Sequence, residues 1–272
     1  MSDTPLRRDD VLPLLRSTFV ESVHFFREAA STNDEAHRRA RDNDQLPALF
    51  ITARQTAGRG RGTNRWITSA GALTFSLLAD VSDLHAKQES WPQLSLWTAL
   101  GVRSGLSSFV PEIELQVKWP NDVYLQQKKV CGILIEGVVG APHLLVIGIG
   151  INANNVFMNN SDDDDLSGIA IALTDVCGDV QIVDVLREAL IGIERAWRSF
   201  AEQLDVRASW EPHCLLSGRS VRWQSGTSTH TGICRGINHD GALLLELAQE
   251  IGSTTQQNGA NTIKCYGGTV SF

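Results

Sequence analysis

Residues 115–151 read LQVKWPNDVYLQQKKVCGILIEGVVGAPHLLVIGIGI, and this stretch decides the fold of the chain. Residues 115–119 alternate apolar and polar side chains, which is the pattern of a strand with one buried face. Residues 130–139 and 143–151 are rich in Ile, Val and Leu, so each predicts a further strand. Strands that follow one another without a helix between them argue against a strict βαβ winding.

The sequence on either side adds two earlier strands and three helices. Residues 48–54 and 72–79 are strand-like, and residues 32–35 (TNDE) match the capping box that begins a helix. Apolar residues recur at helical spacing in residues 96–110 and again in residues 182–204. Strands in pairs with helices grouped between them predict an α+β fold, in which helices pack on a mixed β-sheet.

The last part of the chain has no helical period. Short strand candidates occur at residues 220–223, 229–237 and 242–247. The segment His239-Asp240-Gly241 predicts a turn between the last two, so we expect a small C-terminal β-barrel. We therefore place one domain at residues 1–214, with residues 1–27 as a short lead-in, and a second domain at residues 215–272.

Composition restricts the classes of function. Of the 272 residues, 42% are hydrophobic and 20% are charged, as in a globular protein. The formal net charge of -7 disfavours a general nucleic-acid-binding protein. No apolar run reaches the roughly 18 residues needed to span a bilayer, so we expect no membrane partner. The cysteines are widely spaced, which predicts reduced thiols in a cytoplasmic protein: Cys131, Cys177, Cys214, Cys234 and Cys265.

Residues 54–66 (RQTAGRGRGTNRW), which we call the basic loop, interrupt this acidic chain. They include four arginines and three glycines, and no acidic residue occurs between Asp44 and Asp80. Glycine lets the backbone approach a ligand closely, and arginine has planar donors that suit phosphate or carboxylate. The segment predicts an anion-binding loop that orders around its ligand. The alternative is a mobile, solvated loop.

Polar residues also stand at the ends of the central strands. In residues 118–122 (KWPND), Pro120 ends a strand and presents Asn121 and Asp122 beyond it, where a carboxylate would suit Mg²⁺ beside a phosphate. Lys129 stands at the mouth of an apolar strand, where an ammonium would stabilise a phosphoryl transition state. Both segments also have a plain structural interpretation, as a strand-ending turn and as a hairpin with solvated lysines.

Three other segments are less specific. Gly148 and Gly150 lie in an apolar strand that ends at Asn152, which indicates close approach of a ligand or backbone, or a packing requirement. Ser31-Thr32-Asn33 is typical of a helix N-cap, although a helix N-terminus also suits an anion. The acidic run from Asp162 to Asp165 lacks calcium-loop spacing and predicts a solvated loop.

Together, and in this order, these segments resemble the biotin–protein ligases. The motifs are Ser31-Thr32-Asn33, residues 55–61 (QTAGRGR) with Trp66, residues 118–122 (KWPND), Lys129 with residues 130–136 (VCGILIE), and residues 148–152 (GIGIN). Residues 236–245 are similar to the small SH3-like barrel of that family. The resemblance covers nearly the whole chain from Ser31 to Phe272, and it implies a catalytic domain like that of class II synthetases.

The resemblance implies a two-step reaction. Biotin and MgATP would form biotinyl-5′-adenylate, and the biotinyl group would then pass to a lysine of the biotin carboxyl carrier protein of acetyl-CoA carboxylase. Lys129 and Arg61 would be catalytic. The biotin site would comprise Ser31, Thr32, Asn33, Gln55, Gly58, Arg59, Gly60, Arg61, Trp66, Lys129 and Gly132. The nucleotide would contact Arg59, Arg61, Lys118, Asn121 and Asn152, and Asp122 would bind Mg²⁺.

Other functions and two departures from the family pattern stay open. A lipoate–protein ligase of the same fold and a non-catalytic biotin-binding regulator are the alternatives. Only 30 residues precede Ser31, which are too few for the DNA-binding winged helix of some members, so we expect no DNA partner. We expect the protein to be a monomer or a homodimer. The third glycine of the loop, Gly62, stands one position earlier than in the family. An arginine that often ends the family barrel is missing beyond Phe272.

Overall fold

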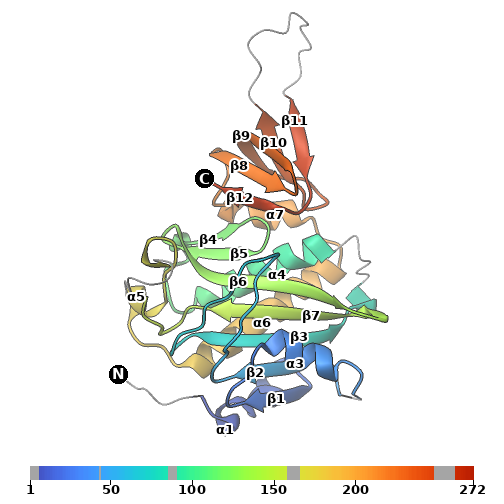
Figure 1. Ribbon diagram of the computed structural model, residues 1–272, viewed down its shortest axis with the longest axis vertical. Coiled ribbons are helices and arrows are strands. Elements are labelled where there is room, and N and C mark those ends of the chain that lie inside the picture. Colours follow the sequence, from blue (N-terminus) through green and yellow to red (C-terminus); the bar gives the residue numbers. More distant parts are fainter. Residues whose placement is uncertain (1–5, 43, 85–90, 158–165, 248–260) are drawn as a thin grey trace, which may run out of the picture.

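The computed structural model describes residues 6–42, 44–84, 91–157, 166–247 and 261–272. The acidic run at residues 162–165 lies outside them. The described residues form two β-sheets with packed helices (Figure 1): one sheet of seven strands in the order β1-β2-β3-β7-β6-β5-β4, and one of five in the order β11-β10-β9-β8-β12. The strands of the first sheet are β1 (Ser22–Phe26), β2 (Ala48–Thr52), β3 (Leu73–Asp80), β4 (Leu115–Lys118), β5 (Asp122–Leu125), β6 (Lys128–Val138) and β7 (Ala141–Ile151).

The first sheet is mixed, as the sequence predicts. β1 runs parallel to β2, and every other neighbouring pair in this sheet is antiparallel. β1 lies within the segment predicted to be a lead-in, so residues 1–27 contribute an edge strand to the sheet as well as two short helices. The helices are α1 (Arg8–Val11), α2 (Leu14–Ser17), α3 (Thr32–Arg39), α4 (Trp91–Leu106), α5 (Thr174–Cys177), α6 (Ile182–Ala201) and α7 (Val206–Trp210).

Helices cover both faces of the first sheet. On one face α4 and α6 pack closely. An added Cβ at Gly101 of α4 would lie only 2.7 Å from Ile193 Cα of α6, so this contact requires glycine. Trp91 of α4 lies against Gly137 of β6 on this side. On the opposite face Asn33 of α3 lies against Gly148 of β7. The two faces of β6 and β7 therefore have different partners: a helical core behind, and α3 with the basic loop in front.

The second sheet is antiparallel. Its strands are β8 (Ser220–Ser225), β9 (Ser228–Ile237), β10 (Leu243–Leu247), β11 (Thr262–Cys265) and β12 (Thr269–Ser271). The predicted turn is confirmed, because Gly241 N donates to Asn238 O at 3.0 Å between β9 and β10. The pairing confirms a second β-structure, whereas the SH3-like barrel and the division at residue 214 stay predictions.

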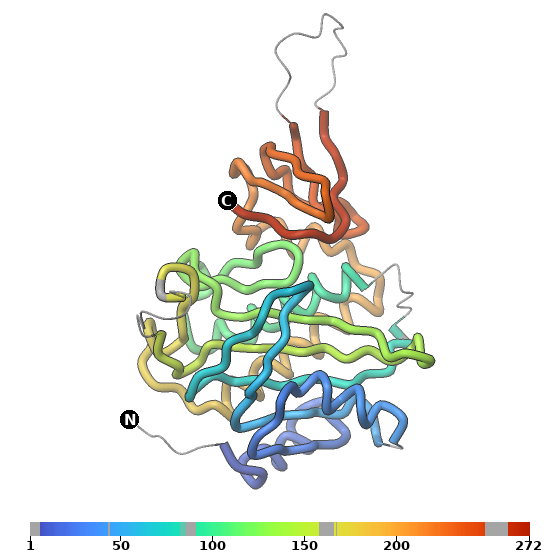
Figure 2. The backbone as a smooth tube through the Cα atoms, viewed as in Figure 1, coloured from blue at the N-terminus to red at the C-terminus, as the bar shows by residue number. Residues whose placement is uncertain are grey.

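The two sheets touch near the ends of β4 and β9. Trp119, just after β4, donates its indole N–H to Gly241 O at 3.0 Å. Cys214 forms a parallel bridge with Val117 of β4. Figure 2 follows the chain from the first sheet into the second and shows that its C-terminal end returns toward β4 and β5. Within the described ranges, none of the helices has the length and apolar character that a membrane crossing requires.

Candidate active site

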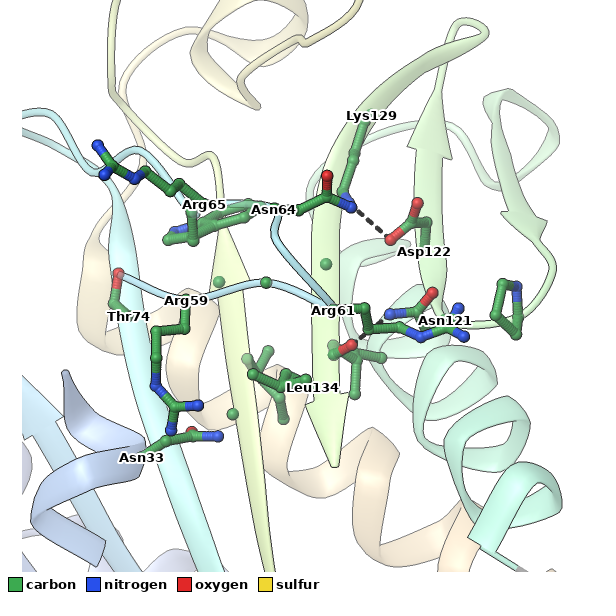
Figure 3. A pocket seen from close by; sticks show the side chains of 18 of the residues that line it. Asn33, Arg59, Arg61, Asn64, Arg65, Thr74, Asn121, Asp122, Lys129 and Leu134 are labelled. Atoms are coloured by element: carbon green, nitrogen blue, oxygen red, sulfur yellow. Dashed lines mark hydrogen bonds and ion pairs between the residues drawn. The ribbon is translucent and has the colours of Figure 1, made fainter. Parts of the chain in front are cut away.

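A cavity of about 220 Å³ lies on the front face of the first sheet, under the basic loop (Figure 3). It is lined by Ser31, Thr32, Asn33, Gln55, Arg59, Gly60, Arg61, Asn64, Arg65, Trp66, Thr74, Lys118, Trp119, Pro120, Asn121, Asp122, Lys129, Gly132, Ile133, Leu134, Gly148, Ile149, Gly150, Thr269 and Val270. Five basic side chains and one acidic side chain line it, in a chain of net charge -7. The cavity is thus a local concentration of positive charge.

The floor of the cavity is one row of residues across the sheet. The pairing register places Thr74 opposite Gly150, Gly150 opposite Gly132, and Gly132 opposite Asp122. Neighbours in such a row share a face of the sheet, so the register alone brings residues from β3, β7, β6 and β5 to the same surface. The two glycines in the middle leave room above the backbone.

Side chains occupy that room, which bears out the packing interpretation of the glycines. A Cβ at Gly150 would lie within 2.5 Å of Trp66 Nε1, and a Cβ at Gly132 would lie 3.2 Å from Trp66 Cζ3. The indole of Trp66 therefore lies across β6 and β7, with Lys129 Nζ 5.8 Å from the ring centroid. Gly148 makes the same kind of room for Asn33.

A buried polar network forms the end of the cavity next to α3. Thr32 N donates to Gln55 Oε1 at 2.9 Å, and Ser76 Oγ lies 2.7 Å from Thr32 Oγ1 and 2.6 Å from Asn33 Oδ1. All four residues are at most 7% exposed. A cluster of amide and hydroxyl groups that is fixed in this way would suit a neutral ligand with both donors and acceptors.

The predicted capping box at residues 32–35 is wrong, whereas the predicted helix N-cap in Ser31-Thr32-Asn33 is confirmed. Ser31 is the N-cap of α3, and its side chain makes no capping hydrogen bond. Thr32 is instead the first helical residue, and its hydroxyl contacts Gln55 and Ser76. The helix start therefore supplies polar side chains to the cavity wall, and its first amide, Thr32 N, donates to Gln55 Oε1.

The opposite end of the cavity is cationic. Lys129 Nζ forms an ion pair with Asp122 Oδ1 at 2.7 Å. Lys118 Nζ lies 5.4 Å from the ring centroids of both Tyr124 and Phe272. Burial lowers the pKa of Lys118, with Lys129 adding to the effect and Asp122 opposing it. Burial also lowers the pKa of Arg61, against the charge of Asp122. One carboxylate thus faces three cations, and an anionic ligand would relieve their repulsion.

A register shift brings Lys129 into the cavity. Gly132 pairs with Asp122, but Lys129 pairs with Tyr124, so β6 has one residue more than β5 between these pairs. In a regular strand Val130 would share the face of Gly132 and Lys129 would point to the helical core. The extra residue reverses this, as β-bulges do: Val130 is buried in the core and Lys129 lines the cavity.

The basic loop is a short hairpin in its second half. Gly60 N donates to Asn64 O at 2.8 Å, Asn64 N to Arg61 O at 3.1 Å, and Trp66 N to Gly58 O at 3.1 Å. Gly62 has φ +63° at the first central position of the Arg61–Asn64 turn, a conformation that favours glycine. The shifted glycine is therefore the residue that makes this tight turn.

Arg59 is bound to protein carboxylates. Its guanidinium donates to both oxygens of Glu136 at 2.7 and 2.8 Å and to Asp34 Oδ1 at 2.8 Å. Asn33 Nδ2 donates to Glu136 Oε2 at 2.6 Å. Burial alone would raise the pKa of Glu136, but the hydrogen bonds from Arg59 and Asn33 outweigh it and hold that pKa below its ordinary value.

The donors present do not fit a metal held by the protein alone. Among the residues that the structure describes, no three His, Cys, Asp or Glu side chains are grouped to hold a metal ion. The carboxylate of Asp122 is engaged by Lys129. The Mg²⁺ role predicted for Asp122 stays a prediction.

The structure brings together most of the residues predicted for the site. Gly58 and Asn152 do not line the cavity: Gly58 lies against the backbone of Trp66, and Asn152 Nδ2 donates to Lys129 O at 3.2 Å. Sequence reasoning missed the wall residues Thr74, Thr269 and Val270, and it included Asn64 and Arg65 only as part of the basic loop. The strand period of β3 would have indicated Thr74, whereas no local signal in the C-terminal strand pointed to the cavity.

Comparisons with known proteins agree with this geometry. The model of the biotin/lipoate A/B protein ligase family matches residues 27–152. The chain is 31% identical over 227 residues to the bifunctional ligase/repressor BirA of Bacillus subtilis, covering 82% of this chain and 68% of that protein. It is 32% identical over 224 residues to the biotin--[acetyl-CoA-carboxylase] ligase of Paracoccus denitrificans, covering 79% and 90%.

A solved structure shows the same relationship in three dimensions. The biotin protein ligase from Aquifex aeolicus, solved in complex with biotin and ATP, superimposes with a TM-score of 0.75 at 27% identity. The match covers 92% of this chain and 98% of that one. The shared fold, the family match and the relatives that align over most of their length lead to one conclusion. The chain belongs to the biotin protein ligases, within the biotin/lipoate A/B protein ligase family.

Proposed function

We propose that this ligase activates biotin with ATP and transfers it to a lysine of a biotin carboxyl carrier protein. In the first step a carboxylate oxygen of biotin attacks the α-phosphorus of ATP, and pyrophosphate leaves. In the second step the neutral amine of the carrier lysine attacks the carbonyl carbon of biotinyl-5′-adenylate. AMP leaves, and the proton of the amine passes to solvent.

The observation that carries this proposal is the cluster of Arg61, Lys118 and Lys129 around the single carboxylate of Asp122. Biotin carboxylate and triphosphate are both anions, so they approach one another only where positive charge offsets their repulsion. Lys129 would hold the biotin carboxylate near the α-phosphate and stabilise the charge that develops there. Arg61 and Lys118 would bind phosphate oxygens, with Mg²⁺ entering as the counterion of ATP.

The polar network at the other end supports biotin as the acid that is activated. A ureido ring has two N–H donors and a carbonyl acceptor, which match the amide and hydroxyl groups of Thr32, Asn33 and Gln55. Trp66 would close an apolar wall beside the ring. A lipoyl chain has no ureido group and would offer these amide and hydroxyl groups neither donors nor acceptors. We therefore favour biotin over lipoate.

One assay tests the proposal. The protein is incubated with labelled biotin, MgATP and an isolated biotin carboxyl carrier domain, and label on the carrier is measured. The expected result is ATP-dependent label that disappears when the acceptor lysine of the carrier is replaced by arginine. Equal transfer of labelled lipoate would make the chain a lipoate ligase. Tight biotin binding without ATP turnover would make it a binding regulator.

A further inference from the structure

We propose that Arg59 is a positioning residue that latches the basic loop onto Glu136 and Asp34, and that it is not a ligand of the substrate anions. The latch joins the loop to strand β6 through Glu136 and to helix α3 through Asp34. It spans the end of the cavity formed by the polar network. The inference deepens the proposed function, since it says how the biotin end of the site is closed.

Charge balance distinguishes Arg59 from Arg61, its neighbour in the same motif. The single positive charge of Arg59 already faces two carboxylates, and both oxygens of Glu136 accept from it in the paired geometry that arginine favours. Arg61, in contrast, forms no ion pair with a carboxylate among the described residues, and the charge of Asp122, which acts on it, is shared with two lysines. A phosphate or carboxylate would therefore gain at Arg61, while at Arg59 it would have to displace two acids.

The same acid also fixes the polar network. Glu136 Oε2 accepts from Asn33 Nδ2 at 2.6 Å, and Asn33 Oδ1 lies 2.6 Å from Ser76 Oγ. Glu136 lies on the same face of β6 as Gly132 and Leu134, four residues beyond Gly132 and two beyond Leu134. One carboxylate thus orients Asn33 and holds the loop, so closure of the loop and orientation of the biotin-facing amide are linked.

Hydrogen exchange in the protein without ligands tests the latch. An isolated two-stranded hairpin is marginally stable in water, so the amides of Gly60, Asn64 and Trp66 are protected only while the loop is held against the sheet. We expect Glu136→Gln and Asp34→Asn to speed exchange of these amides by roughly 2- to 5-fold, the scale of a lost ion pair that is partly exposed. Glu35→Gln is the control, because Glu35 lies on the same helix and pairs with Arg38.

The outcomes separate the latch from the proposed function. Loop amides that exchange freely in the unmodified protein, or that are unaffected by both latch variants, would overturn the latch, whatever the enzyme activates. A second measurement uses a non-hydrolysable biotinyl-adenylate analogue. Asp34→Asn leaves Asn33 and its contacts in place, so it should raise the dissociation rate of the analogue with little change in the rate of pyrophosphate release. If Asp34→Asn instead loses pyrophosphate release while the analogue stays bound, Arg59 acts at the reacting site.

Discussion

Replacing Lys129 by alanine should abolish most of the adenylation rate without unfolding the protein. The side chain of Lys129 is 33% exposed and its ammonium pairs with Asp122 at 2.7 Å. The substitution leaves Arg61 and Lys118 to offset Asp122 and two incoming anions. Loss of one positioned donor at a developing charge typically costs 10²–10³-fold in rate, or about 3–4 kcal/mol of barrier. Single-turnover release of pyrophosphate from labelled ATP, with biotin in excess, measures this loss directly.

Stability should change far less than rate. A partly exposed ion pair contributes at most about 1 kcal/mol to folding, so urea unfolding of Lys129→Ala should stay within that range of the unmodified protein. Lys128→Ala is the matched control, because Lys128 is the preceding residue on β6 and does not line the cavity. Pyrophosphate release by Lys129→Ala within threefold of the Lys128→Ala rate would refute the role assigned to this lysine.

Three further predictions concern the second sheet, the floor and the latch. Phe272→Ala removes one of the two rings beside the ammonium of Lys118, so KM for ATP should rise by roughly 2- to 5-fold, or about 0.5–1 kcal/mol, while KM for biotin is unchanged. Gly150→Ala places a Cβ in the indole of Trp66 and should cost about 1–3 kcal/mol of stability in urea. Trp66→Ala in the same chain should recover most of it, and additive losses would contradict the contact. The pKa of Glu136 is lowered in the folded protein, so its contribution to stability is present above the ordinary pKa of 4.5 and is lost as pH falls through the lower folded value. The free energy of unfolding of Glu136→Gln should therefore fall less steeply with decreasing pH than that of the unmodified protein.

The strands and long helices could be predicted because their signals are local. Residues 130–139 and 143–151 are apolar over a length that suits strands, and they match β6 and β7 within two residues. β1, in contrast, was predicted only as part of a lead-in. Its sequence, SVHFF, alternates polar and apolar side chains over only four residues, which is a short signal, and all five side chains are of intermediate exposure. Its place at the edge of the sheet depends on pairing with β2, which no local pattern reports.

The glycines show a similar division. Their presence in apolar strands indicated that something approaches the backbone closely, but a ligand, a backbone and packing were equally compatible with the sequence. The structure shows Asn33 over Gly148 and Trp66 over Gly150. These partners come from segments more than 80 residues away in the chain, so only the folded chain identifies them.

The sequence by itself determined which residue types stand near the strand ends: arginines and glycines in the basic loop, and lysines at the end of β4 and at the start of β6. Those types were enough to indicate chemistry between anions. Only the tertiary structure decided how each one is used. A single extra residue in β6 turns Lys129 toward the cavity, and two distant carboxylates engage Arg59, whereas Arg61 lies under the influence of Asp122. The physical reason is that composition and period are properties of neighbouring residues, whereas strand register and charge pairing are settled between segments that meet only on folding.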